Sequence, residues 1–155
     1  MRVLAIGADP DDIEIACSGT LAKCVKRGDK VIVCHASTGN LGHVIIPPDE
    51  LTKIRKKEAE RAGSLAGIEV IGGMFNDLDI FDNNKAARDK MVEVIKYAQP
   101  DFIITHNPDD YMPDHTAAGI RRELYSNASE LQMRRRKSGE ISADILYGHA
   151  CGREF

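Results

Sequence analysis

The chain has 155 residues, of which 43% are hydrophobic and 29% charged, and its formal net charge is -3. This length allows one domain with a substantial core, and the composition is that of an ordinary globular protein. The slightly acidic balance argues against a nucleic-acid-binding role. We also expect no membrane span and no secretory signal, because no apolar run is long enough and no signal-peptide pattern is present. The sequence therefore predicts a cytoplasmic domain.

The first apolar run of the chain ends in a cluster of carboxylates. Residues 3–8 are typical of a buried parallel strand, and Asp9, Asp11 and Asp12 follow directly. Ligands of α/β proteins bind beyond the carboxyl ends of such strands. A helix cap accounts for one of these acids, but three neighbouring carboxylates repel one another unless a cation lies among them. The stretch therefore predicts a bound metal ion.

The rest of the chain alternates between helices and strands. Apolar spacing predicts helices over residues 13–27, 48–66, 87–98 and 117–131, and strands over 30–37, 69–74, 101–105 and 143–150. Gly28 and Gly67 end the first two helices. The inward faces of the second and fourth helices are expected at Leu51, Ile54, Ala62 and Leu65, and at Ala117, Ile120, Leu124, Ala128 and Leu131.

Single helices between strands predict a Rossmann-like three-layer α/β/α fold. Right-handed crossovers give a mostly parallel sheet of about five strands with helices on both faces. In the common doubly wound order, the first and fourth strands are neighbours. This order places the acidic loop at residues 9–12 beside the loop at residues 106–115. We therefore expect one site that combines Asp9, Asp11, Asp12 and His115.

These motifs, in this order, resemble the LmbE-like or PIG-L-type zinc-dependent N-acetylglucosaminyl deacetylases. The family's Ala-His-Pro-Asp-Asp motif corresponds to residues 8–12, its Gly-Thr-Leu to residues 19–21 and its Pro-Asp-His to residues 113–115. Thr38-Gly39 and the segment from Arg55 to Glu58 also fall in the family's order. The resemblance implies a single deacetylase domain over residues 1–155 that lacks the family's C-terminal portion. It also implies a small N-acylated amine or amino sugar as substrate.

Carried over by position, the resemblance implies that Asp9, Asp12 and His115 bind zinc. It further implies that Asp11 is the general base and that Arg55 contacts substrate. Asp9 departs from the family, which has a histidine there. A carboxylate at this position makes the metal centre less positive, which predicts weaker catalysis and tolerance of manganese or iron. We expect the Asp9→His substitution to raise zinc occupancy.

Several other loop residues are candidates for substrate binding. Met112 stands where many family members have a histidine, and His43 or His106 is a candidate oxyanion donor in its place, each with a loop-forming role as the alternative. Asp79 and Asp110 are candidates for contacting substrate or supporting the ligands, although loop acids of this kind usually form turns.

Other functions fit parts of the pattern. A metal-binding paralogue without catalysis would be consistent with Asp9. The spacing of Asp9 and Asp11 also resembles the Asp-x-Asp signature of haloacid dehalogenase-like phosphatases, in which the Pro-Asp-His motif has no role. A dinucleotide-binding module is disfavoured, because the first turn lacks G-x-G-x-x-G. The fifth strand leaves an edge that a homo-oligomer would cover.

Overall fold

The fold is given by a computed structural model, which describes residues 1–80, 85–119 and 144–148. Its elements follow the order β1 (Arg2–Gly7), α1 (Asp12–Arg27), β2 (Lys30–Ser37), α2 (Pro48–Ala66), β3 (Glu69–Phe75), α3 (Lys85–Ala98), β4 (Phe102–His106), α4 (Pro113–Gly119) and β5 (Asp144–Gly148). The alternation of strands and helices predicted from apolar spacing is therefore confirmed.

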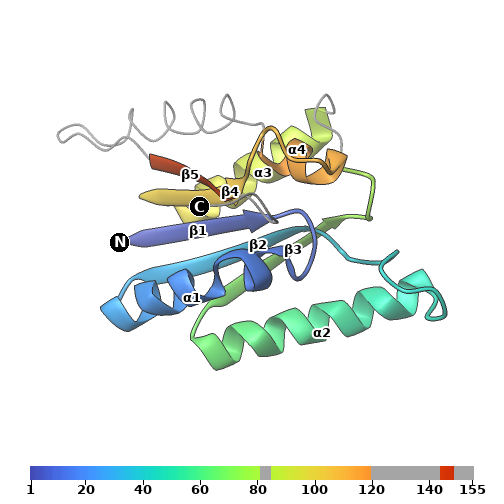
Figure 1. Cartoon of the computed structure of the whole chain (residues 1–155), viewed down its shortest axis with the longest axis horizontal. Coiled ribbons are helices and arrows are strands. Elements are labelled where there is room, and N and C mark those ends of the chain that lie inside the picture. The colour runs from blue at the N-terminus through green and yellow to red at the C-terminus, as the bar shows by residue number, and fades with distance from the viewer. Residues whose placement is uncertain (81–84, 120–143, 149–155) are drawn as a thin grey trace.

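The strands form one five-stranded sheet in the order β3-β2-β1-β4-β5. Every neighbouring pair is parallel, and β1 pairs with β4 from Val3↔Phe102 to Ile6↔Thr105. Helices α1 and α2 cover one face of the sheet, and α3 and α4 lie on the other (Figure 1). The three-layer α/β/α fold and the adjacency of the first and fourth strands are both confirmed. The loops after β1 and β4 consequently leave the sheet side by side.

Residues of β1 alternate between the two faces of the sheet. Leu4 and Ile6 pack into a core with Val94 and Ile95 of α3. Val3 and Ala5 pack into a second core on the opposite face, with Ile13 and Leu21 of α1 among its other members. This alternation follows from the two-residue period of a strand. Because β1 is buried on both faces, it gives the loop that follows it a rigid base.

Two glycines allow close approach of neighbouring backbones. Gly72 of β3 has a φ of 133°, and a Cβ there would lie 1.9 Å from the carbonyl oxygen of His35. The register between β2 and β3 shifts immediately after this point. At Gly119 a Cβ would lie 2.3 Å from the carbonyl oxygen of His106. Helix α4 can therefore pack directly against the end of β4.

The inward face expected for α2 is partly wrong. The buried residues of this helix are Leu51 and Gly63, whereas Leu65 is 83% exposed. A Cβ at Gly63 would lie 2.4 Å from the Val70 side chain, so the helix touches β3 there. Leu65 is two residues further on, about 200° around the helix, and points away.

Among the described helices, none combines the length and apolarity that crossing a membrane requires. The inward positions expected at Ile120, Leu124, Ala128 and Leu131 lie outside the described residues.

Candidate metal centre

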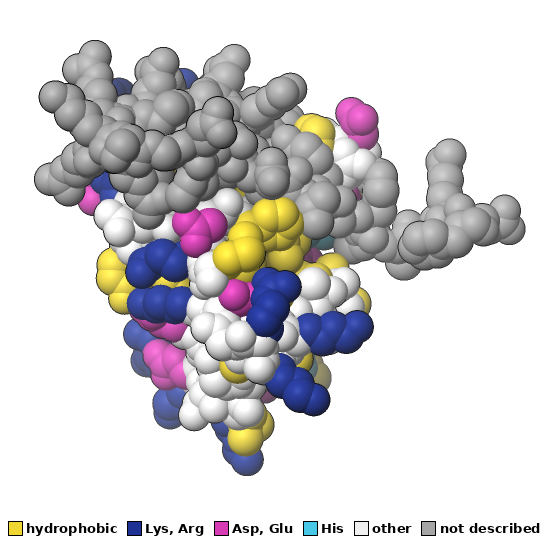
Figure 2. Space-filling view, turned by 90° about the vertical axis from the view of Figure 1, so that its left-hand side faces the viewer, with side chains coloured by type: hydrophobic (Ala, Val, Ile, Leu, Met, Phe, Trp, Pro, Cys, Tyr) yellow, Lys and Arg dark blue, Asp and Glu magenta, His cyan; other side chains and the backbone are white. Residues whose placement is uncertain are grey.

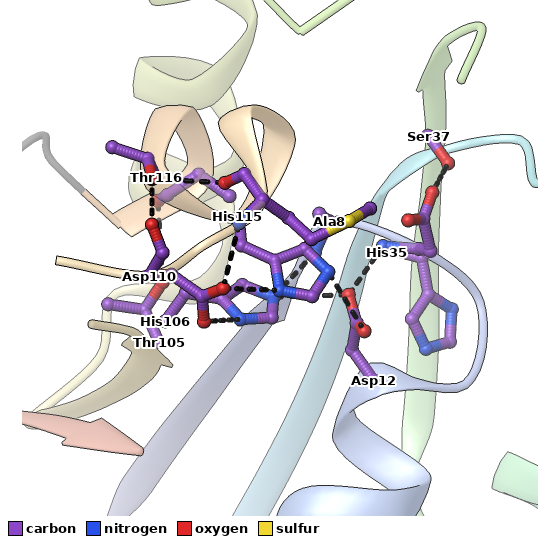
Figure 3. Close-up of polar contacts among 12 residues, drawn as sticks. Ala8, Asp12, His35, Ser37, Thr105, His106, Asp110, His115 and Thr116 are labelled. Atoms are coloured by element: carbon purple, nitrogen blue, oxygen red, sulfur yellow. Dashed lines mark hydrogen bonds and ion pairs between the residues drawn. The ribbon is translucent and has the colours of Figure 1, made fainter. Parts of the chain in front are cut away.

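Three side chains from three elements converge beyond the carboxyl ends of β1 and β4. Asp12 begins α1, His106 ends β4 and His115 lies in α4, and one ligand atom of each falls within 4.8 Å of the others. Asp12 contacts Nε2 of His106 at 3.1 Å and Nε2 of His115 at 3.5 Å. The imidazole rings are stacked, with centroids 4.1 Å apart (Figure 3). The predicted convergence of Asp12 and His115 is therefore present, and His106 joins them.

The atoms that meet in this cluster are mostly acceptors. Backbone amides already donate to two of them: that of Ala8 to Nε2 of His106 at 3.0 Å, and that of Asp9 to Oδ2 of Asp12 at 2.7 Å. Burial opposes ionisation of Asp12, but its contacts with His106, the Asp9 amide and His115 outweigh that effect and hold its pKa below the usual range. An ionised carboxylate facing two ring nitrogens is a suitable place for a cation.

The donor set fits a divalent transition metal. Two imidazoles and one carboxylate are typical ligands of catalytic zinc and of non-haem iron. The side chains of His106 and His115 are 5% and 7% exposed, and that of Asp12 is 11% exposed, so little solvent competes for them. With a divalent ion, this set carries a formal charge of about +1. The chain thus provides two imidazoles at this point although position 9 is an aspartate.

The triad does not include Asp9. Its Oδ1 accepts a hydrogen bond from Oγ of Ser37 at 2.6 Å, and Asp77 Oδ1 lies 2.7 Å from the same hydroxyl. Burial raises the pKa of Asp9, and the charges of Asp77, Asp12 and Asp114 raise it further, against the hydrogen bond from Ser37. The structure therefore places Asp9 in a neighbouring acidic cluster, and its role as a ligand stays a prediction.

Asp11 directly precedes Asp12 of the triad. It occupies the N-cap position of α1, but its side chain makes no capping hydrogen bond. Desolvation and the charge of Asp12 raise its pKa, and Arg55 partly opposes them. A carboxylate with a raised pKa holds a proton more readily than an ordinary aspartate. Asp11 is also exposed, and its raised pKa suits a group that accepts and donates a proton.

Arg55 borders a cavity of about 570 Å³ between α2 and the sheet. The same cavity is lined by Pro10, next to Asp11, and by Thr38. The Arg55 side chain is 31% exposed and its ion pair with Glu58 is loose, at 3.5 Å. The guanidinium is thus available to a further polar partner.

The remaining sequence candidates divide into two groups. Asp110 lies against the two imidazoles, on the side opposite Asp12 (Figure 3). His43 is exposed, and its Nδ1 accepts the amides of Ile45 and Ile46 within its own loop. Asp79 is also exposed, and it accepts a hydrogen bond from Asn76 within a turn. The contacts of His43 and Asp79 are those of loop formation.

The sequence predicts no role for Ser37, Asp77 or Asp114, although Asp114 is part of the Pro-Asp-His motif. Ser37 ends β2 and joins Asp9 to Asp77. Asp114 is 4% exposed and accepts the amide of Leu78 at 2.7 Å. All three follow or end near the carboxyl edge of the sheet, which is the signal that could have found them.

Comparison with known proteins decides the family. Residues 4–124 match the family described as PIG-L, GlcNAc-PI de-N-acetylase. The chain belongs to this family. Membership in the PIG-L family leaves the phosphatase alternative without support.

Relatives of the chain differ in their named activities. It is 29% identical to a 1D-myo-inositol 2-acetamido-2-deoxy-alpha-D-glucopyranoside deacetylase of Corynebacterium diphtheriae, over 76% of this chain and 49% of that protein. It is 27% identical to a 4-oxalmesaconate hydratase of Pseudomonas putida, over 70% of this chain and 49% of that protein. The chain thus spans about half the length of these relatives.

A solved structure supports the same fold. The N,N'-diacetylchitobiose deacetylase of Pyrococcus horikoshii superimposes with a TM-score of 0.76 at 24% identity, over 95% of this chain and 60% of that one. At this identity the likeness establishes the fold alone. The described residues therefore share the fold of this solved structure.

Proposed function

We propose that the chain carries the metal centre of a metal-dependent N-deacetylase that acts on N-acetylated amino sugars. The observation that supports this most strongly is the triad of Asp12, His106 and His115. Beside it lies Asp11, whose side chain makes no capping hydrogen bond. The named activity of the Corynebacterium diphtheriae relative supports the substrate class.

Each residue has a distinct part in this proposal. Asp12, His106 and His115 would hold a zinc, manganese or iron ion, which supplies polarisation of the amide carbonyl and lowers the pKa of water. Asp11 accepts a proton from the attacking water as the new C–O bond forms. It then donates that proton to the nitrogen as the C–N bond breaks, which releases acetate and the free amine.

Arg55 would bind a part of the substrate that lies away from the reacting carbonyl. Its guanidinium borders the cavity next to Pro10, and Thr38 offers a hydroxyl in the same cavity. A planar, permanently charged donor suits sugar hydroxyls or an anionic substituent. The Arg55→Gln substitution should therefore raise KM more than it lowers kcat.

The third ligand is the point at which structure and family motif differ. We propose His106 rather than Asp9, because His106 lies in the triad while Asp9 is bonded to Ser37. Asn replaces each side chain with a neutral group of similar size. His106→Asn should weaken zinc binding by at least about 100-fold, whereas Asp9→Asn should change it only slightly. The reverse result would restore Asp9 as the ligand.

The activity itself is tested by release of primary amine from N-acetylglucosamine and its glycosides. The metal-free chain is reloaded with zinc, manganese or iron, and metal content is measured alongside amine. We expect hydrolysis to require the metal and Asp11, and to be unchanged in Asp109→Asn, which alters an exposed acid of the same loop. Stoichiometric metal without amine release from any such substrate would instead support the non-catalytic paralogue.

The Pseudomonas putida relative favours a second candidate function. Its name describes addition of water to an unsaturated acid rather than amide hydrolysis. Asp11 and the triad contain the groups that such a reaction also needs, namely a proton acceptor and a Lewis acid site. Loss of absorbance from a conjugated oxo-acid, with no amine release in parallel assays, would support hydration.

A further inference from the structure

We propose that Asp110 is a positioning residue that holds both imidazoles of the triad with their Nε2 lone pairs directed at Asp12. The proposal rests on the metal-dependent function proposed above, but its geometry concerns this chain alone. Asp110 Oδ1 lies 3.2 Å from Nδ1 of His115, and Oδ2 lies 3.9 Å from Nδ1 of His106. One carboxylate therefore faces the δ nitrogens of both ligands.

The two rings are oriented alike between two carboxylates. Their planes are stacked at 22°, with Asp110 on the Nδ1 side and Asp12 on the Nε2 side of both (Figure 3). An anion on the Nδ1 side favours the tautomer that carries its proton there, and for His115 the nearer carboxylate is Asp110, at 3.2 Å against 3.5 Å for Asp12. For His106 the nearer carboxylate is Asp12, at 3.1 Å from Nε2 against 3.9 Å from Asp110 to Nδ1, so the tautomer of that ring depends on the amide of Ala8. Each ring then presents an unprotonated Nε2 to Asp12, as metal ligation requires.

Two independent contacts support this tautomer. The amide of Ala8 donates to Nε2 of His106 at 3.0 Å, which needs a lone pair at that atom. This donor opposes the pull of Asp12, 3.1 Å from the same atom, and favours the proton of the neutral ring on Nδ1. The Nδ1 of His115 is buried and makes no aligned hydrogen bond within the described residues, so the carboxylate 3.2 Å away is the acceptor placed to stabilise a proton there.

Asp110 is itself held in place. Its side chain is 3% exposed, and its Oδ1 also accepts the amide of Met112 at 3.1 Å. Its carbonyl oxygen lies 3.1 Å from Oγ1 of Thr116, and its amide donates to the carbonyl of Asn107 at 3.1 Å. Thr116 follows His115 directly, so the contact fastens the loop to the helix that carries the ligand. A fixed carboxylate can orient two rings at once.

Replacing Asp110 by asparagine keeps the packing of the side chain but changes which imidazole tautomers it favours. Asparagine has nearly the same shape, but it offers one carbonyl oxygen and one NH2 group. The oxygen, held by the amide of Met112, can accept a proton from Nδ1 of His115. The NH2 group then faces Nδ1 of His106 and disfavours a proton there. One of the two rings should therefore move its proton to Nε2, where it faces Asp12 and cannot bind a metal.

The experiment measures imidazole tautomers and zinc affinity. In the metal-free wild-type chain at about pH 8, long-range 15N–1H correlations should show the proton on Nδ1 of both His106 and His115. In Asp110→Asn, one ring should switch, and zinc affinity, measured against a chromogenic chelator, should fall by about 10–100-fold. Asp109→Asn, which changes the exposed neighbouring acid, should leave both readouts unaltered.

Either measurement can overturn the proposal. A proton on Nε2 of either ring in the wild-type chain contradicts it, and this result needs no variant to fold. Unchanged tautomers and zinc affinity in a folded Asp110→Asn chain contradict it as well. A wild-type chain with both Nδ1 protons that binds no metal would instead remove the metal-dependent function and leave the positioning role intact.

Discussion

Acidic side chains have different neighbours at the two edges of the sheet where its strands begin and end. Figure 2 looks onto the amino-terminal edge, where basic and acidic side chains are intermixed. There the ammonium of Met1 binds Asp29 at 2.8 Å, and Lys30 pairs with Glu69 at 3.2 Å. Hydrogen bonds from the Met1 ammonium and Arg27 lower the pKa of Asp29. These acids are matched by cations of the chain itself.

At the carboxyl-terminal edge the acids face one another. Asp9, Asp11 and Asp12 leave β1 together, and Asp77 meets Asp9 across the hydroxyl of Ser37. Burial and neighbouring carboxylates raise the pKa values of Asp9 and Asp11. The difference teaches that charge at one edge fastens the chain, whereas charge at the other has few cations of the chain beside it, as the metal binding and proton transfer proposed above require.

The largest effect should come from removing the one carboxylate of the triad. Asp12→Asn keeps the size of the side chain but loses the anion that faces both imidazoles. We expect metal binding to weaken by more than about 100-fold and amide hydrolysis to fall below detection. Metal content after gel filtration and amine release measure the two effects. Asp89→Asn, an exposed acid of α3, is the control, and full metal retention in Asp12→Asn would refute the centre.

Loss of Asp11 should spare the metal and remove the chemistry. Asp11→Asn cannot accept a proton, so kcat should fall by about 10²–10⁴-fold at unchanged metal content. In the wild-type chain the raised pKa of Asp11 should place the acid limb of the kcat/KM profile above the usual aspartate range. Arg55 opposes this rise, so Arg55→Gln should move the limb to still higher pH. If the pH of the acid limb is the same in Asp11→Asn and Arg55→Gln as in the wild-type chain, Asp11 is excluded as the base.

How far the sequence predicts this molecule depends on what sets each feature. Apolar periodicity fixes the strands and helices, because burial on one or both faces determines which residues can be apolar. The common doubly wound order then makes the first and fourth strands neighbours, and this brings Asp12 and His115 together. Leu65 was misplaced because the contact line of α2 depends on Gly63, whose tight approach to Val70 is visible only in three dimensions.

The candidate ligands are harder to predict, because side-chain direction decides which of them converge. Asp9 occupies the motif's ligand position, but Ser37 and Asp77 hold it at the end of β2. His106 was expected to donate to an oxyanion, yet its ring lies against His115 within the triad. No motif records a stacked pair of imidazoles contributed by a strand end and a helix. The neighbours of loop acids and histidines are therefore visible only in the folded structure.

A smaller effect concerns the stability of the metal-free chain. Removing a charge should stabilise the chain at the carboxyl-terminal edge and destabilise it at the amino-terminal edge. The pKa of Asp9 is raised in the folded state, so its stabilising contribution is present when it is protonated and is lost as pH rises through that pKa. Asp9→Asn cannot ionise, and it should therefore raise Tm at about pH 8, by roughly 2–4 °C for each kcal/mol relieved. The difference should vanish toward about pH 4. A lower Tm for the variant at both pH values would mean that Asp9 is not strained by its charged neighbours.

The smallest effect should come from the amino-terminal edge, where the same kind of change has the reverse sign. Lys30→Gln removes the cation that pairs with Glu69, but the Lys30 side chain is 49% exposed and the contact is at 3.2 Å. Urea unfolding of the metal-free chain should show a loss of less than about 1 kcal/mol. The hydrogen bond from Tyr97 also lowers the pKa of Glu69, so that acid stays ionised near neutral pH and its contribution disappears only in acid.

Because salt screens an exposed pair, the loss should shrink at about 1 M ionic strength, whereas the gain in Asp9→Asn, which arises from buried charge, should persist. Equal salt sensitivity of the two variants would remove the distinction between the two edges.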